Sequence, residues 1–278
     1  MQTVLTIAGF DPSSGAGVTA DLMVFAAHGL FGASAITALT VQSTLGVRAT
    51  YPVSAEILRE TLSYLHADLP PAGIKIGMLA TAANVAAVCS YIEQLRQSES
   101  RIPIVLDPIL ISSSGRELLD AEGLIALREH LLPLVDWVTP NIAELAALTC
   151  TPVTRREDLA HASIALQSQV RYMEQIADKD FVRQLGILAT GGHLDPPDDF
   201  LVTPTGEQLW LPGQRILTRA THGTGCALSS AFLSRLVLGD PPAEAARAAK
   251  QYVAAALESA MPRGSGHSSM NHLWNLSN

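Results

Sequence analysis

Short apolar runs alternate with longer, alanine-rich amphipathic segments along most of this 278-residue chain. This alternation is typical of βαβ units, in which a helix crosses back over the sheet after each strand. The run Ile104-Val105-Leu106 is apolar throughout, which indicates a strand covered on both faces. Strands are expected at 3–8, 34–41, 73–76, 104–106, 137–139 and 186–189, with a late hairpin of 201–202 and 208–210. The pattern predicts an α/β fold with a mostly parallel central sheet.

The length and composition suit one large domain covering residues 1–278, because 48% of the residues are apolar and only 16% are charged. The segment 155–184 is more polar, and we expect a surface helix there with a loop near 172–180. The tail from about residue 262 is rich in Gly, Ser and His, so it is a candidate mobile end.

Charge and cysteine content exclude several classes of protein. A net charge of -8 argues against a broad nucleic-acid-binding surface, which needs clustered Lys and Arg. Cys89, Cys150 and Cys226 are widely spaced and form no CxxC pair, so neither a disulfide framework nor a structural zinc site is indicated. Signal-peptide and membrane-span patterns are both missing from the sequence, and we expect a soluble cytoplasmic protein.

Candidate site residues follow the expected strands, because ligands of open parallel sheets bind beyond the carboxyl ends of the strands. Polar or flexible residues stand at each of these positions. They are 9–17 and Asp21 after the first strand, Gln42 after the second, Gly77 and Met78 after the third, Asp107 and Pro108 after the fourth, 139–144 after the fifth, and 190–193 after the sixth. The sequence therefore predicts one polar rim along the sheet.

The segment Thr221-His222-Gly223-Thr224-Gly225-Cys226 places two glycines and a thiol before a helix expected over 227–239. Glycines let the backbone bend sharply, and the unpaired N–H groups and dipole of a first helical turn attract a phosphate or a developing oxyanion. The same field favours the thiolate form of Cys226. A buried structural cysteine is the alternative, but the flanking glycines favour an anion site with a nucleophile or base.

The segment Gly15 to Ala20 fits the G-x-G-x-x-G/A pattern of dinucleotide-binding proteins. Those domains carry an acidic residue roughly 20 positions further on, where it holds the ribose. This chain has no acid between Asp21 and Glu56, and it also lacks a Walker A loop. The sequence therefore argues against nicotinamide chemistry and against a P-loop.

These motifs resemble those of the hydroxymethylpyrimidine/phosphomethylpyrimidine kinases, a family of the ribokinase superfamily. They occur in the same order along nearly the whole chain. The residues that carry the resemblance are 6–9, 11–12, 15–17, 20–22, 36–39 with Gln42, 75–79, 107–108, 114–115, 139–141 with Glu144, 191–193 and 221–226. The resemblance implies a ribokinase-like three-layer α/β/α sandwich and a homodimer. It also implies an ATP- and Mg²⁺-dependent kinase that phosphorylates 4-amino-5-hydroxymethyl-2-methylpyrimidine, and then its monophosphate to the diphosphate, in thiamine diphosphate biosynthesis.

The resemblance places the pyrimidine near Gly9, Asp21, Gln42 and Met78. A primary amide such as Gln42 suits an aminopyrimidine, because a ring nitrogen beside an exocyclic amine offers an acceptor next to a donor. Met78 is expected to pack on the ring, with ordinary core filling as the alternative. For Asp21 the alternative is a solvated charge early in a helix.

For the chemistry, the resemblance makes Cys226 the base and the N–H groups of Gly223, Thr224 and Gly225 the anion hole. Most of the wider superfamily has an aspartate at this position, so the cysteine indicates the branch that acts on heterocyclic alcohols. We expect a modest contribution from the base, since a loose phosphoryl-transfer transition state keeps the hydroxyl largely protonated until late.

The resemblance assigns Asp107, Asn141 and Glu144 to the nucleotide and metal end of the site. Asp107 and Glu144 are expected to organise Mg²⁺ through water, because Mg²⁺ keeps much of its hydration shell. The alternative is a capping role, in which Asn141 is the N-cap of a helix and Glu144 stands three residues later. Capping and a role at the nucleotide and metal end are compatible.

Thr190 and Gly192 complete the expected nucleotide site, and here the sequence departs from the family. Many members have a lysine that reaches the ATP phosphates where this chain has Thr190. Lys75 and Arg116 are the candidates that could replace this charge.

Three other functions stay open. A pyridoxal or pyridoxine kinase shares the Gly-Thr-Gly-Cys turn, and a hydroxyethylthiazole kinase shares the glycine-cysteine turn. A catalytically weak pyrimidine-binding protein would account for the missing lysine. Gln42 and Met78 favour the aminopyrimidine.

Overall fold

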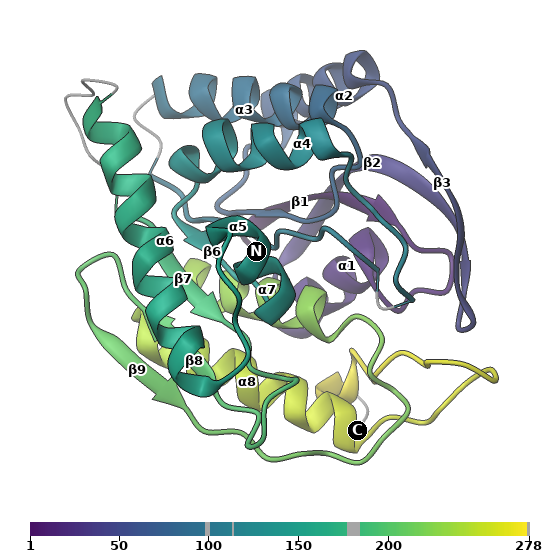
Figure 1. The fold of residues 1–278 in the computed structure, drawn as a ribbon. Helices are drawn as coiled ribbons and strands as arrows, with labels where there is room; N and C mark the ends of the chain where they lie inside the picture. The colour runs from purple at the N-terminus through teal and green to yellow at the C-terminus, as the bar shows by residue number, and fades with distance from the viewer. Residues whose placement is uncertain (98–100, 113, 177–183, 277–278) are drawn as a thin grey trace.

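The computed structural model describes residues 1–97, 101–112, 114–176 and 184–276, and Figure 1 shows its fold. Within these ranges nine strands form one sheet in the order β3-β2-β1-β4-β5-β6-β7-β8-β9. The strands are β1 (Thr3–Phe10), β2 (Phe31–Ser43), β3 (Gly46–Pro52), β4 (Ile74–Ile76), β5 (Ile104–Leu106), β6 (Trp137–Val138), β7 (Gly186–Ala189), β8 (Asp199–Val202) and β9 (Gln208–Leu211). The neighbouring pairs β2–β1, β1–β4, β4–β5, β5–β6 and β6–β7 are parallel. The pairs β2–β3, β7–β8 and β8–β9 are antiparallel.

Helices cover both faces of the sheet, as Figure 1 shows. They are α1 (Gly17–Ala27), α2 (Ala55–Asp68), α3 (Ala82–Gln97), α4 (Ala121–Ala126), α5 (Ile142–Thr149), α6 (Arg156–Ile176), α7 (Thr224–Val237) and α8 (Pro242–Glu258), with short helical turns η1 (Leu127–Leu131), η2 (Leu132–Leu134) and η3 (Trp274–Leu276). One core joins the sheet to α2, α3, α5 and α6, and the other joins it to α1, α7 and α8. The predicted α/β sandwich with a mostly parallel central sheet is confirmed.

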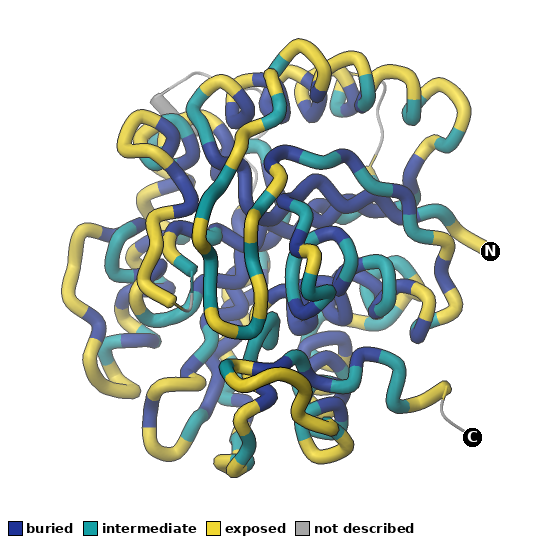
Figure 2. Tube along the Cα trace, turned by 90° about the vertical axis from the view of Figure 1, so that its right-hand side faces the viewer, coloured by how far each residue is buried: buried dark blue, intermediate teal, exposed yellow. Residues whose placement is uncertain are grey.

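The apolar composition of β5 follows from its place between two cores. Side chains alternate along a strand, so Ile104 and Leu106 enter the core under α2, α3, α5 and α6, while Val105 enters the core under α7 and α8. All three are fully buried, and Figure 2 shows how burial is concentrated in the centre of the molecule. Both faces of this strand therefore require apolar residues.

The sequence analysis missed strand β3, which pairs antiparallel with the end of β2. Residues 46–52 contain no apolar run, and they lie at the edge of the sheet with intermediate or high exposure. An edge strand with one covered face carries a weaker hydrophobic pattern than a central strand. Strand β2 is also longer than expected, since it continues to Ser43 and carries Gln42 out to the rim.

The expected helix of segment 155–184 is present as α6, which ends at Ile176. The expected loop near 172–180 starts too early, because residues 172–176 are helical, and its remainder lies outside the described residues. Along the described chain there is no helix with the length and apolar character needed to cross a membrane.

The C-terminal tail packs on the protein, although its composition made it a candidate mobile end. The backbone of His267 donates to the carbonyl of Thr44 at 2.8 Å, and the backbone of His222 donates to the carbonyl of Ser268 at 3.1 Å. Met270 is only 3% exposed and belongs to the core of α7 and α8. The tail thus joins the β2–β3 turn to the segment before α7.

Candidate active site

Helix α7 begins at Thr224, three residues earlier than expected, so Cys226 lies within its first turn. Gly223 precedes it with φ of +80°, and a Cβ there would lie 1.8 Å from the carbonyl oxygen of Gly15. Only glycine fits this position, for both reasons. The first bond of the helix runs from Ala227 N to Gly223 O at 2.9 Å, and no side chain caps the helix. The preceding N–H groups are therefore available to an anion.

The rim of the sheet meets this turn at Asp107. A Cβ on Gly225 would lie 3.9 Å from Oδ2 of Asp107, and the Ser229 hydroxyl donates to the same oxygen at 3.3 Å. Asp107 is 4% exposed and Cys226 is 6% exposed. The structure therefore brings the predicted anion hole, the thiol and one predicted metal-site carboxylate together.

The Cys226 thiol is not activated as the sequence analysis expected. Burial raises the pKa of Cys226 to about 12, and the charges of Asp107 and Asp21 add to this rise, while Lys75 opposes it. The expectation of a thiolate was wrong for the ligand-free protein, because the helix field that favours it is outweighed by desolvation and by two nearby carboxylates.

Asp21 is buried below the rim instead of lying on it. Its side chain is 0% exposed and accepts hydrogen bonds from Thr6 at 2.6 Å, from Ser230 at 2.7 Å, and from Lys75 at 3.0 and 3.1 Å. In this arrangement Asp21 makes no direct contact with the open rim. Its interaction with the site runs through Lys75, whose Nζ lies 4.0 Å from Oδ2 of Asp107.

Lys75 lies beside the candidate site, in a buried position that the sequence analysis did not recognise. Its side chain is fully buried in β4, and although burial lowers its pKa, Asp21, Cys226 and Asp107 together raise it above its ordinary value. The signal in the sequence was one charged residue between Ile74 and Ile76 in a strand that is otherwise apolar. A buried lysine held in this way carries its charge at neutral pH.

The pyrimidine-binding residues expected from the resemblance lie at the ends of β1, β2 and β4. A Cβ on Gly9 would approach the Met78 sulfur to 2.9 Å, so the absence of a side chain at Gly9 makes room for Met78. Met78 is 6% exposed, and its carbonyl accepts a hydrogen bond from Thr37 at 2.5 Å. A groove of about 810 Å³ adjoins Gln42 and is lined by residues 41–43, 45–48 and 114–116.

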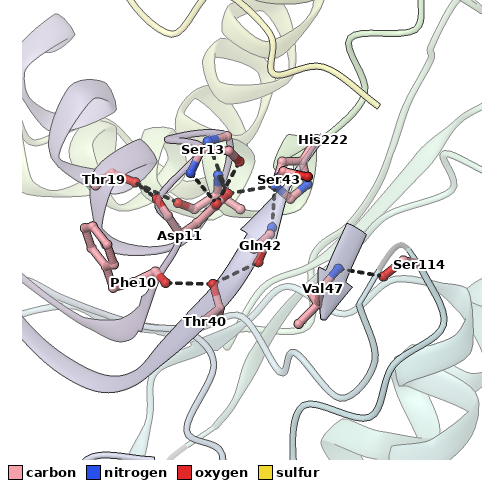
Figure 3. Close-up of polar contacts among 12 residues, drawn as sticks. Phe10, Asp11, Ser13, Thr19, Thr40, Gln42, Ser43, Val47, Ser114 and His222 are labelled. Carbon is pink, nitrogen blue, oxygen red and sulfur yellow. Dashed lines mark hydrogen bonds and ion pairs between the residues drawn. The ribbon is translucent and has the colours of Figure 1, made fainter. Parts of the chain in front are cut away.

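His222 joins the Gln42 side of the site to the turn before α7, as Figure 3 shows. Its Nε2 lies 2.8 Å from Oδ2 of Asp11 and 2.9 Å from the amide nitrogen of Gln42. The sequence analysis quoted His222 and Asp11 within motifs and gave neither a role. His222 and Asp11 are 211 positions apart in the chain, so a local sequence pattern cannot predict their contact.

Asn141 and Glu144 form the capping box at the start of α5 that the sequence allowed. The Asn141 side chain accepts from Glu144 N at 3.0 Å, and the Glu144 carboxylate accepts from Asn141 N at 2.9 Å. Burial and the charge of Asp107 raise the pKa of Glu144 to about 8. Burial also raises the pKa of Asp107 to about 6, with Asp21 contributing and Lys75 opposing.

This pair of buried carboxyl groups fits a hydrated cation. The charge of Asp107 disfavours the ionised form of Glu144, and a bound divalent cation would offset that repulsion. Their oxygens are the donor type that Mg²⁺ prefers. Within the described ranges no group of three or more His, Cys, Asp or Glu side chains is placed to hold a metal ion.

Thr190 lies beside Asn141, because its N–H donates to the carbonyl of Pro140 at 2.9 Å and the two segments form a parallel bridge. The turn that follows is open at Gly192, where a Cβ would meet nothing within 4 Å. The exposed Arg215 lies against this turn and donates to the carbonyls of Gly192 at 3.0 Å and Leu194 at 2.5 Å. Arg215 is therefore a cation at the expected nucleotide end that the sequence analysis missed.

Neither of the two candidates for replacing the missing lysine, Lys75 and Arg116, lies beside Thr190 at the expected nucleotide end. Lys75 is fully buried against Asp21 and offers no surface to a phosphate. Arg116 donates from Nη1 to the carbonyl of Arg48 at 2.8 Å and lines the groove next to Gln42. Arg116 thus lies on the Gln42 side of the site, away from its expected role at the nucleotide.

Comparison with known proteins gives a consistent family. The chain matches the family described as phosphomethylpyrimidine kinase over residues 11–271. It is 38% identical to the hydroxymethylpyrimidine/phosphomethylpyrimidine kinase of Rhizobium meliloti, over 96% of each chain. It is 34% identical to the thiamine biosynthesis bifunctional protein ThiED of Geobacter sulfurreducens over 98% of this chain, and it spans about half of that protein, 52%.

Solved structures show the same fold. The phosphomethylpyrimidine kinase of Clostridium difficile 630 is 32% identical, with a TM-score of 0.73 over 91% of this chain and 98% of that one. An ADP complex of Bacillus subtilis pyridoxal kinase is 26% identical, with a TM-score of 0.84 over 100% of both chains.

Proposed function

Since the chain belongs to the phosphomethylpyrimidine kinase family, we propose that it transfers the γ-phosphoryl group of ATP to the hydroxymethyl group of 4-amino-5-hydroxymethyl-2-methylpyrimidine. The resulting monophosphate is its second substrate, and the diphosphate is the precursor used in thiamine diphosphate biosynthesis. Relatives named for both steps support this assignment. The observation that carries it is the junction at His222, which places the amide of Gln42 next to the turn that precedes the anion hole.

Phosphoryl transfer depends mostly on position and on charge stabilisation. The N–H groups at the start of α7 have no side-chain cap, so they would bind the transferring phosphoryl group, and the helix dipole adds to their field. Gln42 and Met78 hold the ring, so that the hydroxymethyl group lies toward Cys226. When bound, Mg²⁺ would neutralise charge on the phosphates, with Asp107 and Glu144 holding it through water.

Cys226 can accept the hydroxyl proton only in its thiolate form, which then becomes the neutral thiol. The raised pKa makes this form scarce in the ligand-free protein, which agrees with a small contribution from the base. The larger contribution comes from the anion hole, because its N–H groups are held in place before the substrate arrives. Arg215 supplies a cation beside Thr190 and Gly192, where the family lysine is missing.

A homodimer is part of the proposal, with the β2–β3 ribbon as its interface. Leu39, Val41 and Tyr51 lie on the outer side of this ribbon and are 49%, 46% and 62% exposed. Leu39 and Tyr51 are direct cross-strand partners, so these side chains form one apolar surface. A second copy of the same surface would cover it, and sedimentation equilibrium of the wild type and of Tyr51→Glu tests this.

The three cysteines are unpaired, which suits the proposed cytoplasmic location.

A pyridoxal kinase is the second candidate, because the Bacillus subtilis structure superposes over the whole chain. The decisive measurement is ATP consumption by the purified protein with Mg²⁺, offering the aminopyrimidine, its monophosphate, pyridoxal and hydroxyethylthiazole separately. Mass spectrometry identifies each product. We expect turnover of the first two compounds, and pyridoxal turnover alone would assign the protein to the vitamin B6 kinases. Binding of the aminopyrimidine without turnover of any compound would identify a binding protein.

A matched pair of cysteine variants completes the test. Cys226→Ser changes the thiol beside Asp107, whereas Cys150→Ser changes an exposed thiol at the end of α5. Turnover should fall in the first variant and be retained in the second. Equal activity in both variants would remove Cys226 from the mechanism.

A further inference from the structure

The imidazole of His222 is tightly enclosed. A Cβ on Gly15 would lie 2.2 Å from Cδ2 of His222, so the ring packs directly on the backbone of that glycine. The His222 side chain is 13% exposed, and its backbone N–H is held by Ser268 of the C-terminal tail. Figure 3 shows the ring between Asp11 and Gln42. Its Nε2 is thus held within hydrogen-bonding distance of two partners at once.

Asp11 identifies which His222 nitrogen carries a hydrogen. Its Oδ1 accepts from the backbone and hydroxyl of Ser13 at 2.9 and 2.7 Å, and its Oδ2 accepts from the N–H groups of Gly15 and Ala16 at 3.2 and 2.9 Å. Burial favours the neutral acid, but the bonds from His222 and Ser13 lower the pKa of Asp11 below its ordinary value. An ionised carboxylate only accepts, so Nε2 of His222 is the donor at 2.8 Å.

A donating Nε2 cannot also accept from the amide nitrogen of Gln42, which lies 2.9 Å away. The amide oxygen suits this position better, because it can share the single Nε2–H with Asp11 as a second, weaker acceptor, whereas an amide N–H would face that N–H directly. A half-turn of the Gln42 amide about its last torsion exchanges the oxygen and the nitrogen with little other movement.

Thr40 requires the same half-turn from the opposite side of the amide. Its hydroxyl oxygen lies 3.0 Å from the carbonyl of Phe10 and 3.2 Å from Oε1 of Gln42, and both of these oxygens are acceptors. A hydroxyl has one hydrogen, and the carbonyl of Phe10 can only accept it. The amide atom that faces Thr40 is therefore best a nitrogen, which donates to the Thr40 oxygen. Two independent neighbours thus select one orientation of the amide.

We propose that His222 and Thr40 are positioning residues that hold the Gln42 amide with its oxygen toward His222 and its nitrogen toward Thr40, and that this orientation makes the site select a 4-aminopyrimidine over a 4-oxopyrimidine. The proposal rests on the proposed function of Gln42 as the reader of the pyrimidine edge. With both ends held, one N–H of the amide remains for the ring nitrogen and one oxygen lone pair remains for the exocyclic amine. A 4-oxo ring presents the donor and the acceptor in the reverse order.

The 4-oxo ring has no simple way to adapt. Turning the ring over would carry its hydroxymethyl group away from the anion hole. Turning the amide would place an N–H against the N–H of His222 and an oxygen lone pair against the occupied hydroxyl of Thr40. Sites that match a substrate donor and acceptor in this way reject the mismatched analogue strongly, because buried polar groups are left unpaired.

The test compares kcat/KM for 4-amino-5-hydroxymethyl-2-methylpyrimidine with kcat/KM for its 4-oxo analogue. Thr40→Val removes the hydroxyl at nearly constant shape, and Thr40→Ser is the matched control that keeps it. We expect the amino-to-oxo ratio to fall roughly 10-fold or more in Thr40→Val and in His222→Phe. The Thr40→Ser variant should retain the wild-type ratio. Melting temperatures establish that each variant is folded.

A second measurement needs no substrate. Nitrogen NMR of protein labelled in its histidines distinguishes a protonated from an unprotonated Nε2, and His222→Phe identifies the signal. We expect a protonated Nε2 in the ligand-free wild type. An unprotonated Nε2 would overturn the proposal, since Gln42 could then donate to it.

The outcomes separate this proposal from the proposed function. Absence of wild-type turnover with any pyrimidine refutes the kinase assignment, and the NMR result then decides the amide orientation by itself. Wild-type turnover with no preference for the amino compound overturns the selectivity. A preference that Thr40→Val leaves unchanged removes Thr40 from the mechanism of selection.

Discussion

Replacing Lys75 with methionine tests whether the buried charge network holds the active-site side of the sheet together. Methionine has a similar length but no charge, so the substitution removes the ammonium without opening a large cavity. Lys75 and Asp21 are both 0% exposed and lie 3.0 Å apart, and Asp107 lies 4.0 Å from the same nitrogen. After the substitution, two buried carboxyl groups have lost their cation.

The expected loss of stability is large. Removing one partner of a buried ion pair costs about 3–5 kcal/mol, because the remaining charge is buried and uncompensated. For a domain of this size, that loss corresponds to a fall in melting temperature of roughly 6–20 °C. Asp21 keeps its hydrogen bonds from Thr6 and Ser230, which places the loss within this range and not above it.

The loss should also depend on pH. Without Lys75, the pKa of Asp107 rises above its present value of about 6, because the charge that opposed its protonation is gone. A carboxyl group whose folded-state pKa is raised above its unfolded value contributes stability that is present at low pH and lost as the pH rises. The difference between wild type and Lys75→Met should therefore be smaller at pH 5 than at pH 8.

Urea unfolding at both pH values provides the measurement, with Lys250→Met as the control. Lys250 also forms a close pair, at 2.7 Å from Asp199, but its side chain is 19% exposed. Water screens this pair in part, so its loss should cost less. A Lys75→Met variant that loses less stability than Lys250→Met, or whose deficit is larger at pH 5 than at pH 8, would refute the reasoning.

Three further predictions concern activity. Cys226→Ala should lower kcat roughly 10- to 100-fold, since the base acts late in a loose transition state; a larger loss than in Gly223→Ala would contradict this. Gly223→Ala should abolish turnover in a protein that still folds, because the new Cβ would meet Gly15 O at 1.8 Å and displace the anion hole, and near-normal kinetics would exclude that role. Arg215→Ala should raise KM for ATP several-fold with little change in KM for the pyrimidine, whereas Arg215→Lys should recover part of the loss; an equal rise for both substrates would indicate a general distortion.

Much of the fold could be read from local pattern. The central strands were predictable because a strand buried on both faces is apolar at every position, as in Ile104-Val105-Leu106. The glycine-cysteine turn before α7 was recognisable because few residues other than glycine tolerate the backbone that it requires. Strand β3 was not predictable in this way, because an edge strand needs no continuous apolar run.

The positions of the candidate site residues were predicted more completely than their surroundings. Asp107, Cys226, Asn141 and Glu144 lie at the strand and helix ends where the sequence placed them. The ionisation of Cys226 was misjudged, because the sequence reveals the helix start but not the carboxylates that surround the thiol. The packing of the tail was missed because its polar composition does not show that its backbone pairs with Thr44 and His222.

The sequence by itself determined the order of the central strands and their helices, the glycine turns and the residue types at the rim, since each of these depends on neighbours within a few positions of the chain. Only the tertiary structure decided that Lys75 neutralises Asp21 and approaches Asp107, and that His222 lies between Asp11 and Gln42. These contacts join residues from distant parts of the chain. Their charges and hydrogen-bond directions depend on burial and on distances of a few ångströms, which arise when the sheet brings the ends of its strands together.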